Sequence, residues 1–342
     1  MFSLGPSRLY KQVYADETLT EAWRWVKAGT ELAGGDGVTV AHFQARLFAN
    51  LKALQNTLRL RRYHPQPAKR ISMAKADGTR RPLGILTVTD RIVQRAVLFV
   101  IEPLFDAGFE ECSHGFRKEH SVHTALAQVT RLINLGSGWI VDLDIAACFD
   151  QINTALLFRH IKRYLRDAEL RRLIWAWLDV APVTVTRQGV FRTRESRGIL
   201  QGSTLSPLFA NSYLDHFDKM ALKRSLKLVR YADDCVICCR SKPEAEAALK
   251  LVEHILARLE LTVNPRKTAI YHAEKGFQYL GQRLFLKKKG LDEEVVIVPQ
   301  ERATQPHTPR LLDRPLLPRG MPAEHTPQED TWVPSTSPSK GQ

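Results

Sequence analysis

The sequence predicts an α/β (α+β) fold, because segments with helical spacing alternate with short apolar strands. In the N-terminal part, apolar residues recur at helical spacing, for example at Leu51, Leu54 and Leu58. Two short apolar runs, 138–145 and 228–239, carry acidic residues inside them or between them. With 342 residues and a hydrophobic fraction of 44%, the chain can build one large domain or two ordinary ones.

The charge balance predicts a polyanionic partner. The formal net charge is +14 and the pI is about 9.7, which favours nucleic acid or an anionic membrane surface without separating the two. No apolar run approaches the roughly 20 residues that span a bilayer, and the N-terminus lacks the apolar core of a signal peptide. We therefore expect a cytoplasmic protein without a membrane partner.

The five cysteines predict neither a disulfide framework nor a zinc site. Their number is odd, and most of them lie in apolar segments. Cys235 and Cys238 have the two-residue gap of a zinc knuckle, but no second Cys or His pair follows at a suitable distance. His114, His120 and His123 lie near one another in the sequence without a regular ligand spacing.

Asp233 and Asp234 lie between the apolar runs 228–232 and 235–239, a pattern typical of a tight β-hairpin with acids at its tip. Adjacent acids at the junction of buried strands are unfavourable unless a cation or hydrogen-bond donors compensate them. A divalent metal ion is the simplest explanation. Two ordinary turn-forming aspartates are the alternative, because Asp is common in turns.

A second acidic strand is predicted at 138–145, where Asp142 and Asp144 point to the same side. If this strand lies beside the acidic hairpin, both would supply carboxylates to a pair of hard cations, which prefer oxygen ligands. That is the arrangement of two-metal phosphoryl transfer, in which one ion activates the attacking hydroxyl and the other steadies the leaving pyrophosphate.

Residues 70–85 predict a two-stranded ribbon that turns at Asp77-Gly78. Lys75, Arg80 and Arg81 would project from it, and such cations bind a triphosphate strongly. A solvated charged hairpin is the alternative.

At the other end of the chain, nine of the eighteen prolines fall between 299 and 338, and residues 287–342 hold eight basic and eight acidic residues. This tail is expected to be disordered, and the whole net charge belongs to residues 1–286.

The order of motifs resembles that of a reverse transcriptase of the bacterial group II intron type, a group that includes CRISPR-associated reverse transcriptases. The resemblance runs from about residue 34 to residue 284. The matching blocks are Gly35-Asp36-Gly37, Arg81-Pro82-Leu83-Gly84-Ile85, Asp90-Arg91-Ile92-Val93-Gln94, His114-Gly115-Phe116-Arg117, Asp144 to Asp150, Gln201-Gly202 with Ser206-Pro207, Tyr231-Ala232-Asp233-Asp234, Asn264-Pro265 with Lys267-Thr268, and Tyr279-Leu280-Gly281.

The resemblance implies a right-hand polymerase with fingers and palm, an antiparallel palm sheet flanked by helices, and a thumb that is reduced or absent. The implied parts are an N-terminal helical extension at 1–60, fingers at 61–135, a palm with finger insertions at 136–286, and the proline-rich tail at 287–342. In the family a helical thumb or maturase region follows the palm, and here only the tail stands in its place.

The resemblance also implies the site. Asp144, Asp233 and Asp234 would hold two Mg²⁺ ions as catalytic and metal-binding residues, and Asp144 is preferred to Asp142 because Phe149 follows five positions later. The Phe149 ring would lie beneath the sugar of the incoming nucleotide and exclude a ribose 2′-hydroxyl. The other implied contacts are the triphosphate (Lys75 and Arg81, with Arg80 less certain), the nucleotide and template (Gln201 and Gly202), the leaving pyrophosphate (Lys267), and the primer end (Tyr279, Leu280 and Gly281).

The implied activity is RNA-directed DNA polymerisation, with an RNA template, a DNA or RNA primer and dNTPs as partners. A CRISPR integrase, in spacer acquisition, or an intron RNA would provide the natural setting. Leu200 stands where the family often has Pro. The alternatives are a non-catalytic RNA-binding or maturase-like scaffold with the same fold, a truncated inactive intron-encoded protein, and an RNA-directed RNA polymerase, against which Phe149 speaks.

Overall fold

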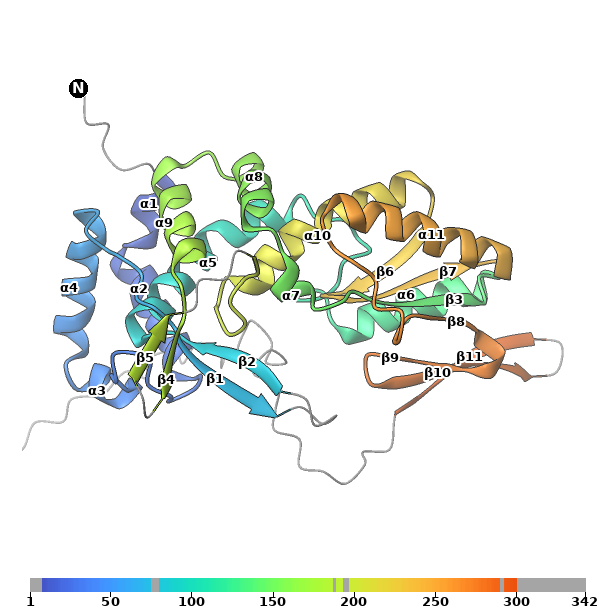
Figure 1. Cartoon of the computed structure of the whole chain (residues 1–342), viewed down its shortest axis with the longest axis horizontal. Coiled ribbons are helices and arrows are strands. Elements are labelled where there is room, and N and C mark those ends of the chain that lie inside the picture. The colour runs from blue at the N-terminus through green and yellow to red at the C-terminus, as the bar shows by residue number, and fades with distance from the viewer. Residues whose placement is uncertain (1–7, 75–79, 187–188, 193–196, 290–291, 300–342) are drawn as a thin grey trace, which may run out of the picture.

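The computed structural model describes residues 8–74, 80–186, 189–192, 197–289 and 292–299. The N-terminal helices and a first sheet lie in one half of the molecule along its long axis, and two further sheets lie in the other half (Figure 1). The predicted α/β (α+β) class is confirmed. No helix in these ranges is both long and apolar enough to cross a membrane.

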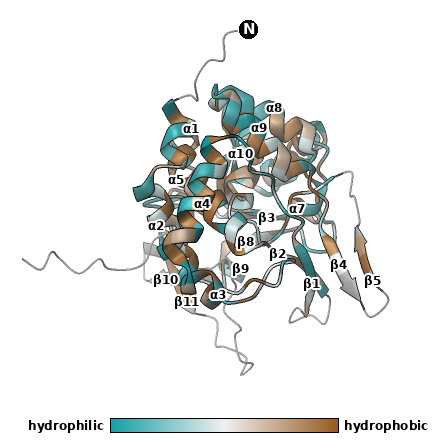
Figure 2. Ribbon diagram, turned by 90° about the vertical axis from the view of Figure 1, so that its left-hand side faces the viewer, coloured by the Kyte–Doolittle hydropathy of each residue, from teal (hydrophilic) through white to brown (hydrophobic). Residues whose placement is uncertain are grey.

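The N-terminal helices share one core with a long buried helix. They are α1 (Arg8–Val13), α2 (Asp16–Lys27), α3 (Val40–Ala45) and α4 (Leu47–Arg59), and the buried helix is α5 (Val88–Asp106). Helix α5 is buried on most of its sides, and its buried residues include the polar Asp90, Arg91, Gln94 and Arg95 beside apolar ones. Helix α4 instead has a buried side, with Leu54 and Leu58, and an exposed one, and its ribbon shows both colours in Figure 2. The helical spacing in the first 60 residues therefore predicted these helices correctly.

The first sheet is formed by β1 (Lys69–Ala74), β2 (Arg80–Ile85), β4 (Val183–Thr186) and β5 (Gly189–Arg192), in the order β2-β1-β4-β5. Strands β1 and β2 pair antiparallel along their whole length, so the predicted ribbon is confirmed. Its tip, residues 75–79 with Lys75, lies outside the described residues.

The central sheet holds both acidic strands. It consists of β3 (Trp139–Asp144), β6 (Lys227–Tyr231), β7 (Asp234–Cys239) and β8 (Ala269–His272), paired antiparallel in the order β6-β7-β3-β8. One face packs against α10 (Ser206–Lys223) and α11 (Lys242–Arg258) through residues such as Leu143 and Ile237. Residues of the opposite face, such as Ile140 and Val236, pack against α6 (Val122–Asn134) and the third sheet.

The third sheet corrects one prediction. Its strands are β9 (Phe277–Tyr279), β10 (Gln282–Lys289) and β11 (Asp292–Pro299), in the order β11-β10-β9. Disorder from residue 287 onward is therefore wrong for residues 287–289 and 292–299, because β11 pairs antiparallel with all of β10. The physical reason is the apolar run 295–298, whose Val295 is buried against α6 and β10. The limits at 60/61 and 135/136 stay predictions.

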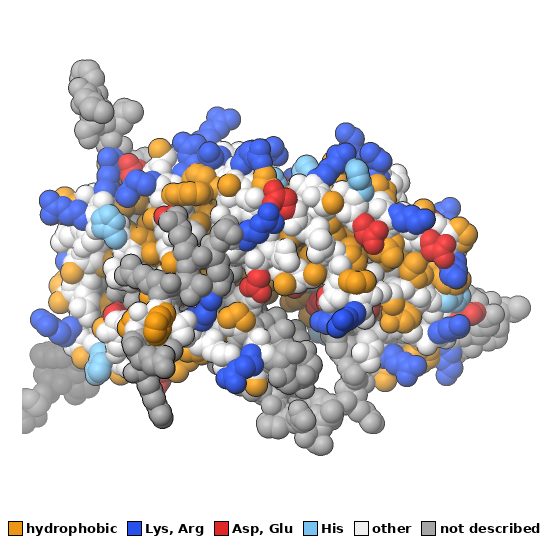
Figure 3. Space-filling model, in the orientation of Figure 1, with side chains coloured by type: hydrophobic (Ala, Val, Ile, Leu, Met, Phe, Trp, Pro, Cys, Tyr) orange, Lys and Arg blue, Asp and Glu red, His pale blue; other side chains and the backbone are white. Residues whose placement is uncertain are grey.

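The remaining helices, α7 (Cys148–Gln151), α8 (Thr154–Tyr164) and α9 (Ala168–Asp179), join the first sheet to the central one. Lys and Arg side chains are spread over the face seen in Figure 3 and gather along its upper edge, above α8 and α9 in Figure 1. Arg159, Lys162 and Arg163 on α8 and Arg166 just after it are exposed. Such a surface agrees with the polyanionic partner that the net charge predicts.

Candidate active site

The acidic hairpin has the predicted form. Strands β6 and β7 are joined by Ala232 and Asp233 alone, and Tyr231 pairs with Asp234 at the last rung of the ladder. Ala232 has a positive φ of 57°, which a two-residue hairpin turn requires at one or both central positions. Asp233 is half-buried and Asp234 is exposed, so both carboxylates lie at the tip.

The second acidic strand lies directly beside the hairpin, as predicted. Strand β3 pairs antiparallel with β7, and Asp144 is the partner of Asp234 at the end of the ladder. Side chains opposite one another in such a pair have Cβ atoms about 4.5–5.5 Å apart. The sheet therefore brings carboxylates from two segments 90 residues apart in the sequence to one edge.

A buried arginine beneath the turn fixes the hairpin. The Arg230 guanidinium is fully buried, forms an ion pair with Asp218 on α10, and donates from Nη1 to the Ala232 carbonyl at 2.8 Å. It also donates to the side chains of Asn211 and Ser113. All five N–H donors are therefore used, which holds the tip of the hairpin against α10 and the 112–115 loop.

Gly115 allows this loop to approach the hairpin. A Cβ atom at this position would lie 2.4 Å from the Ala232 backbone nitrogen. Only glycine permits such a close approach of two backbones. Sequence patterns identified His114-Gly115-Phe116-Arg117 as a block, but they did not reveal that it packs against the acidic turn.

The loop 262–268 holds Asp144 from the other side. The Asn264 side chain donates from Nδ2 to Asp144 Oδ1 at 2.9 Å, and the Asn264 backbone N–H donates to the Asp144 carbonyl at 2.8 Å. The Asp144 backbone N–H donates to Thr268 Oγ1 at 3.1 Å. The Lys267 ammonium lies 3.6 Å from Asp144 Oδ2, and its side chain is 64% exposed. Lys267 thus lies beside the carboxylate edge, where the resemblance implies it.

The clustered carboxylates also affect the pKa of Asp142, which lies two residues before Asp144 on the same face of β3. Burial first, and then the carboxylates of Asp234 and Asp144, raises the pKa of Asp142 to about 6. The ionised form of Asp142 is therefore disfavoured by the fold when no cation is bound.

Asp142→Asn is expected to stabilise the metal-free protein at pH 8. The folded pKa of Asp142 lies above its unfolded value, so the fold loses stability as pH rises from about 4 to 6, and the penalty persists above that. Because the carboxyl group is partly exposed, we expect a gain of about 1–2 kcal/mol rather than the full linkage value. Urea unfolding in EDTA at several pH values measures it. An unchanged pH dependence in the variant would contradict the assignment.

The donors at this edge fit a divalent cation. Asp144, Asp233 and Asp234 offer carboxylate oxygens, the ligands that hard divalent ions prefer. No three His, Cys, Asp or Glu side chains of the described residues already converge as a metal site. Like-charged carboxylates repel one another, so an ion that neutralised them would favour their closer approach.

Two of the predicted nucleotide contacts, Phe149 and Gln201, are connected through the loop 197–202. Phe149 lies on α7, and its carbonyl accepts the Ile199 N–H at 2.8 Å. Gln201 donates from Nε2 to Asp150 Oδ1 at 3.1 Å, and its carbonyl accepts the Gly84 N–H of β2 at 2.7 Å. Gly202 has a φ of 102°, and a Cβ atom there would lie 2.5 Å from the Gly84 carbonyl oxygen. The loop therefore joins α7 to the first sheet.

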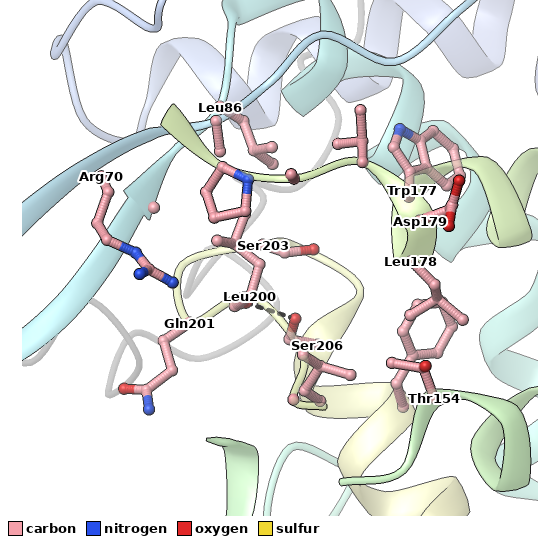
Figure 4. Close-up of a pocket in the computed structure, with 18 of the residues that line it drawn as sticks. Arg70, Leu86, Thr154, Trp177, Leu178, Asp179, Leu200, Gln201, Ser203 and Ser206 are labelled. Atoms are coloured by element: carbon pink, nitrogen blue, oxygen red, sulfur yellow. Dashed lines mark hydrogen bonds between the residues drawn. The ribbon is translucent and has the colours of Figure 1, made fainter. Parts of the chain in front are cut away.

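A cavity of about 280 Å³ opens beside this loop. Its lining includes Arg70 from β1, Trp177 and Asp179 at the end of α9, and Leu200 and Gln201 from the loop (Figure 4). Figure 4 shows the Arg70 guanidinium and the Gln201 side chain on the same side of the cavity. The cavity therefore lies between the first sheet, α9 and the loop that carries a predicted nucleotide contact.

Other predicted contacts are only partly described. Lys75 lies outside the described residues, and Arg81 is placed as a backbone position in β2, opposite Met73. Arg80 donates from Nε to Ser72 Oγ at 2.8 Å on the exposed ribbon.

The predicted primer support lies at the β9–β10 turn. The Tyr279 ring is buried in the core, which raises the pKa of its hydroxyl well above the usual value. Leu280 and Gly281 form the turn, with φ values of 50° and 75°. Tyr279 thus anchors the turn, and the two turn residues are the ones nearer the surface.

The fold and the site together define a nucleic-acid polymerase palm, in which carboxylates from adjacent antiparallel strands lie at one edge of the sheet. Residues 73–284 match the family described as reverse transcriptase (RNA-dependent DNA polymerase). The chain belongs to this family, and its relatives place it with reverse transcriptases of the group II intron type, as the sequence predicted. Reverse transcriptases use divalent metal ions.

Two curated relatives illustrate the similarity. Protein YkfC of Escherichia coli (strain K12) is 33% identical over 344 residues, which cover 88% of this chain and 89% of that protein. The group II intron-encoded protein LtrA of Lactococcus lactis subsp. cremoris is 34% identical over 211 residues, 61% of this chain and 34% of LtrA. The chain thus spans about a third of the length of LtrA.

The chain is also similar to solved structures. The telomerase of Candida albicans in complex with a telomeric RNA fragment has a TM-score of 0.51 at 12% identity, over 70% of this chain and 50% of that chain. This likeness confirms the right-hand polymerase fold and nothing further. A partial Cas6-RT-Cas1–Cas2 complex is 25% identical, with a TM-score of 0.47, over 76% of this chain and 44% of that chain.

Proposed function

We propose that this chain adds deoxynucleotides to a primer on an RNA template, with two Mg²⁺ ions held by Asp144, Asp233 and Asp234. The observation that carries the proposal is the pairing of Asp144 with Asp234 at the open end of the central sheet. When bound, the ions would supply an activated 3′-hydroxyl and charge neutralisation at the leaving pyrophosphate.

The residues around this edge have complementary roles. Asn264 holds one oxygen of Asp144, which leaves the other oxygen toward the exposed side. Lys267 lies on that exposed side, where its ammonium can neutralise charge on the leaving phosphates or give them a proton. Lys75 and Arg81 of the ribbon would bind the triphosphate, with Arg80 as a weaker candidate.

Helix α7 and the loop 197–202 would select the nucleotide. Phe149 and Gln201 are connected through Ile199 and Asp150, so the two side chains are positioned by one local unit. Phe149 would exclude the ribose 2′-hydroxyl, and Gln201 would contact the nucleotide beside the template. Leu280 and Gly281, anchored by the buried Tyr279, would support the primer end.

The natural partners are an RNA template, a primer and, in the cell, an intron RNA or a CRISPR integrase in the cytoplasm. The name of LtrA supports the intron setting. The identity of the neighbouring genes would distinguish the intron setting from the CRISPR setting. A maturase-like scaffold is less well supported, because such a role needs none of the three carboxylates.

Primer extension tests the proposal. The purified chain, given a labelled DNA primer on an RNA template with dNTPs and Mg²⁺, is expected to extend the primer to the template end. EDTA should abolish extension because the carboxylates then hold no cation. A mock purification from the same host provides the control for contaminating polymerases. RNA binding without extension in any divalent metal would favour the scaffold instead.

A further inference from the structure

Asn264 makes an unusual set of contacts for a residue in an exposed turn. Its Nδ2 donates to Asp144 Oδ1 at 2.9 Å, while its own Oδ1 accepts the Arg266 backbone N–H at 3.2 Å. Asparagine side chains commonly bond to a backbone N–H two residues on, which forms an Asx turn. Because the oxygen is used in that turn, the NH₂ group must face Asp144.

The backbone around Asn264 is fixed by the same strand end. The Asn264 N–H donates to the Asp144 carbonyl, and the Ala146 N–H donates to the Thr262 carbonyl. Ile145 and Val263 form an antiparallel bridge between these two contacts. The loop therefore continues the β3 ladder past its last residue, and Asn264 has a defined position relative to the carboxylate.

The two oxygens of Asp144 consequently differ. Oδ1 is occupied by the neutral amide of Asn264, and Oδ2 faces the exposed Lys267 ammonium 3.6 Å away. An amide donor holds a carboxylate in one rotamer without adding charge. Oδ2 is therefore the oxygen that can bind a metal ion, which would replace its contact with the Lys267 ammonium.

We propose that Asn264 is a positioning residue that orients Asp144 for metal binding. It acts through its Nδ2 donor and touches neither the ion nor the substrate. The inference rests on the proposed function, in which Asp144 is a metal ligand. Partners that orient metal ligands by hydrogen bonding are typically worth 10- to 100-fold in metal affinity.

Asn264→Ser removes the side-chain donor to Asp144 but keeps an acceptor for the turn with Arg266. Serine can still accept the Arg266 N–H in the related turn of hydroxyl side chains, but it is too short to replace the amide donor. Asn153→Ser is the matched control. Asn153 caps α8 with its Oδ1 and donates from Nδ2 to Glu260, so serine there keeps a capping oxygen and removes an amide donor outside the site.

The experiment measures Mn²⁺ binding to the full chain without nucleic acid, by the loss of the free-ion electron paramagnetic resonance signal. We expect Asn264→Ser to weaken binding 10- to 100-fold and Asn153→Ser to leave it within twofold of the wild type. The rise in melting temperature on adding Mn²⁺, compared within each variant, should fall for Asn264→Ser alone. This comparison removes any change in the metal-free stability of the variant.

Wild-type affinity in Asn264→Ser would overturn the inference and leave the proposed function intact. Equal Mn²⁺ affinity in the wild type and in Asp144→Asn would instead refute the metal role of the Asp144 carboxylate. In primer extension, Asn264→Ser should raise the Mg²⁺ concentration needed for half-maximal rate by a similar factor, while the KM for dNTPs at saturating Mg²⁺ changes little.

Discussion

Asp144→Asn is expected to lower the kcat of primer extension about 1,000-fold, while Asp142→Asn leaves kcat within about tenfold of the wild type. Both acids lie on the same face of β3. Asp144 is opposite Asp234 at the end of the ladder, whereas Asp142 lies two residues earlier in the strand and pairs with Val236. Asparagine retains the shape of the side chain but removes the negative charge that a cation requires.

Single-turnover primer extension with saturating primer–template and dNTPs measures this contrast. The two variants serve as controls for one another, because each replaces one half-buried carboxylate of the same strand. Near-equal losses in both variants would show that the whole acidic cluster, and not Asp144, determines the rate. A larger loss in Asp142→Asn would move the catalytic role to Asp142.

The sequence predicted the acidic elements because their signal is local. Two aspartates between apolar runs define a hairpin, and the structure ends β6 at Tyr231 and begins β7 at Asp234. An apolar run ending in an acid likewise predicted β3. Local patterns do not give the order of strands in a sheet. The prediction that β3 and β7 are neighbours rested instead on the requirement that their acids share a cation and on the motif order of the family.

The supports of the site were not predictable, since they join distant segments. Arg230 looks like an ordinary cation in the sequence, yet it is fully buried and bonds to Asp218, Asn211 and Ser113. Nothing in a single sequence pairs this strand residue with a helix 12 to 19 positions away and with a loop 117 positions away. The role of Asn264 was hidden for the same reason, 120 positions from Asp144.

Strand β11 was missed for a different reason. Proline content and balanced charge dominate the average over residues 287–342 and conceal the short apolar run 295–298. That run pairs with β10, so the first part of the tail belongs to the third sheet. A window of four to eight residues, the length of a strand, would have separated the run from the prolines.

Phe149→Ala is expected to lower the preference for dNTPs over rNTPs on the order of 100-fold, mainly by raising kcat/KM for rNTPs. Phe149 is half-buried on α7, five residues after Asp144, and its backbone is tied to the 197–202 loop through Ile199. A large side chain fixed there can exclude a 2′-hydroxyl by its volume alone. Removing the ring opens that space without removing a hydrogen bond.

A size series makes this test sharper. If volume decides, the preference should fall from Phe149 through Phe149→Leu to Phe149→Ala, with dNTP incorporation changing much less than rNTP incorporation. Phe99→Ala is the matched control, because Phe99 is also half-buried but lies on α5, against Arg95. An unchanged dNTP preference in both Phe149 variants would show that Phe149 does not exclude the ribose, and selection against the 2′-hydroxyl would then have to come from another residue.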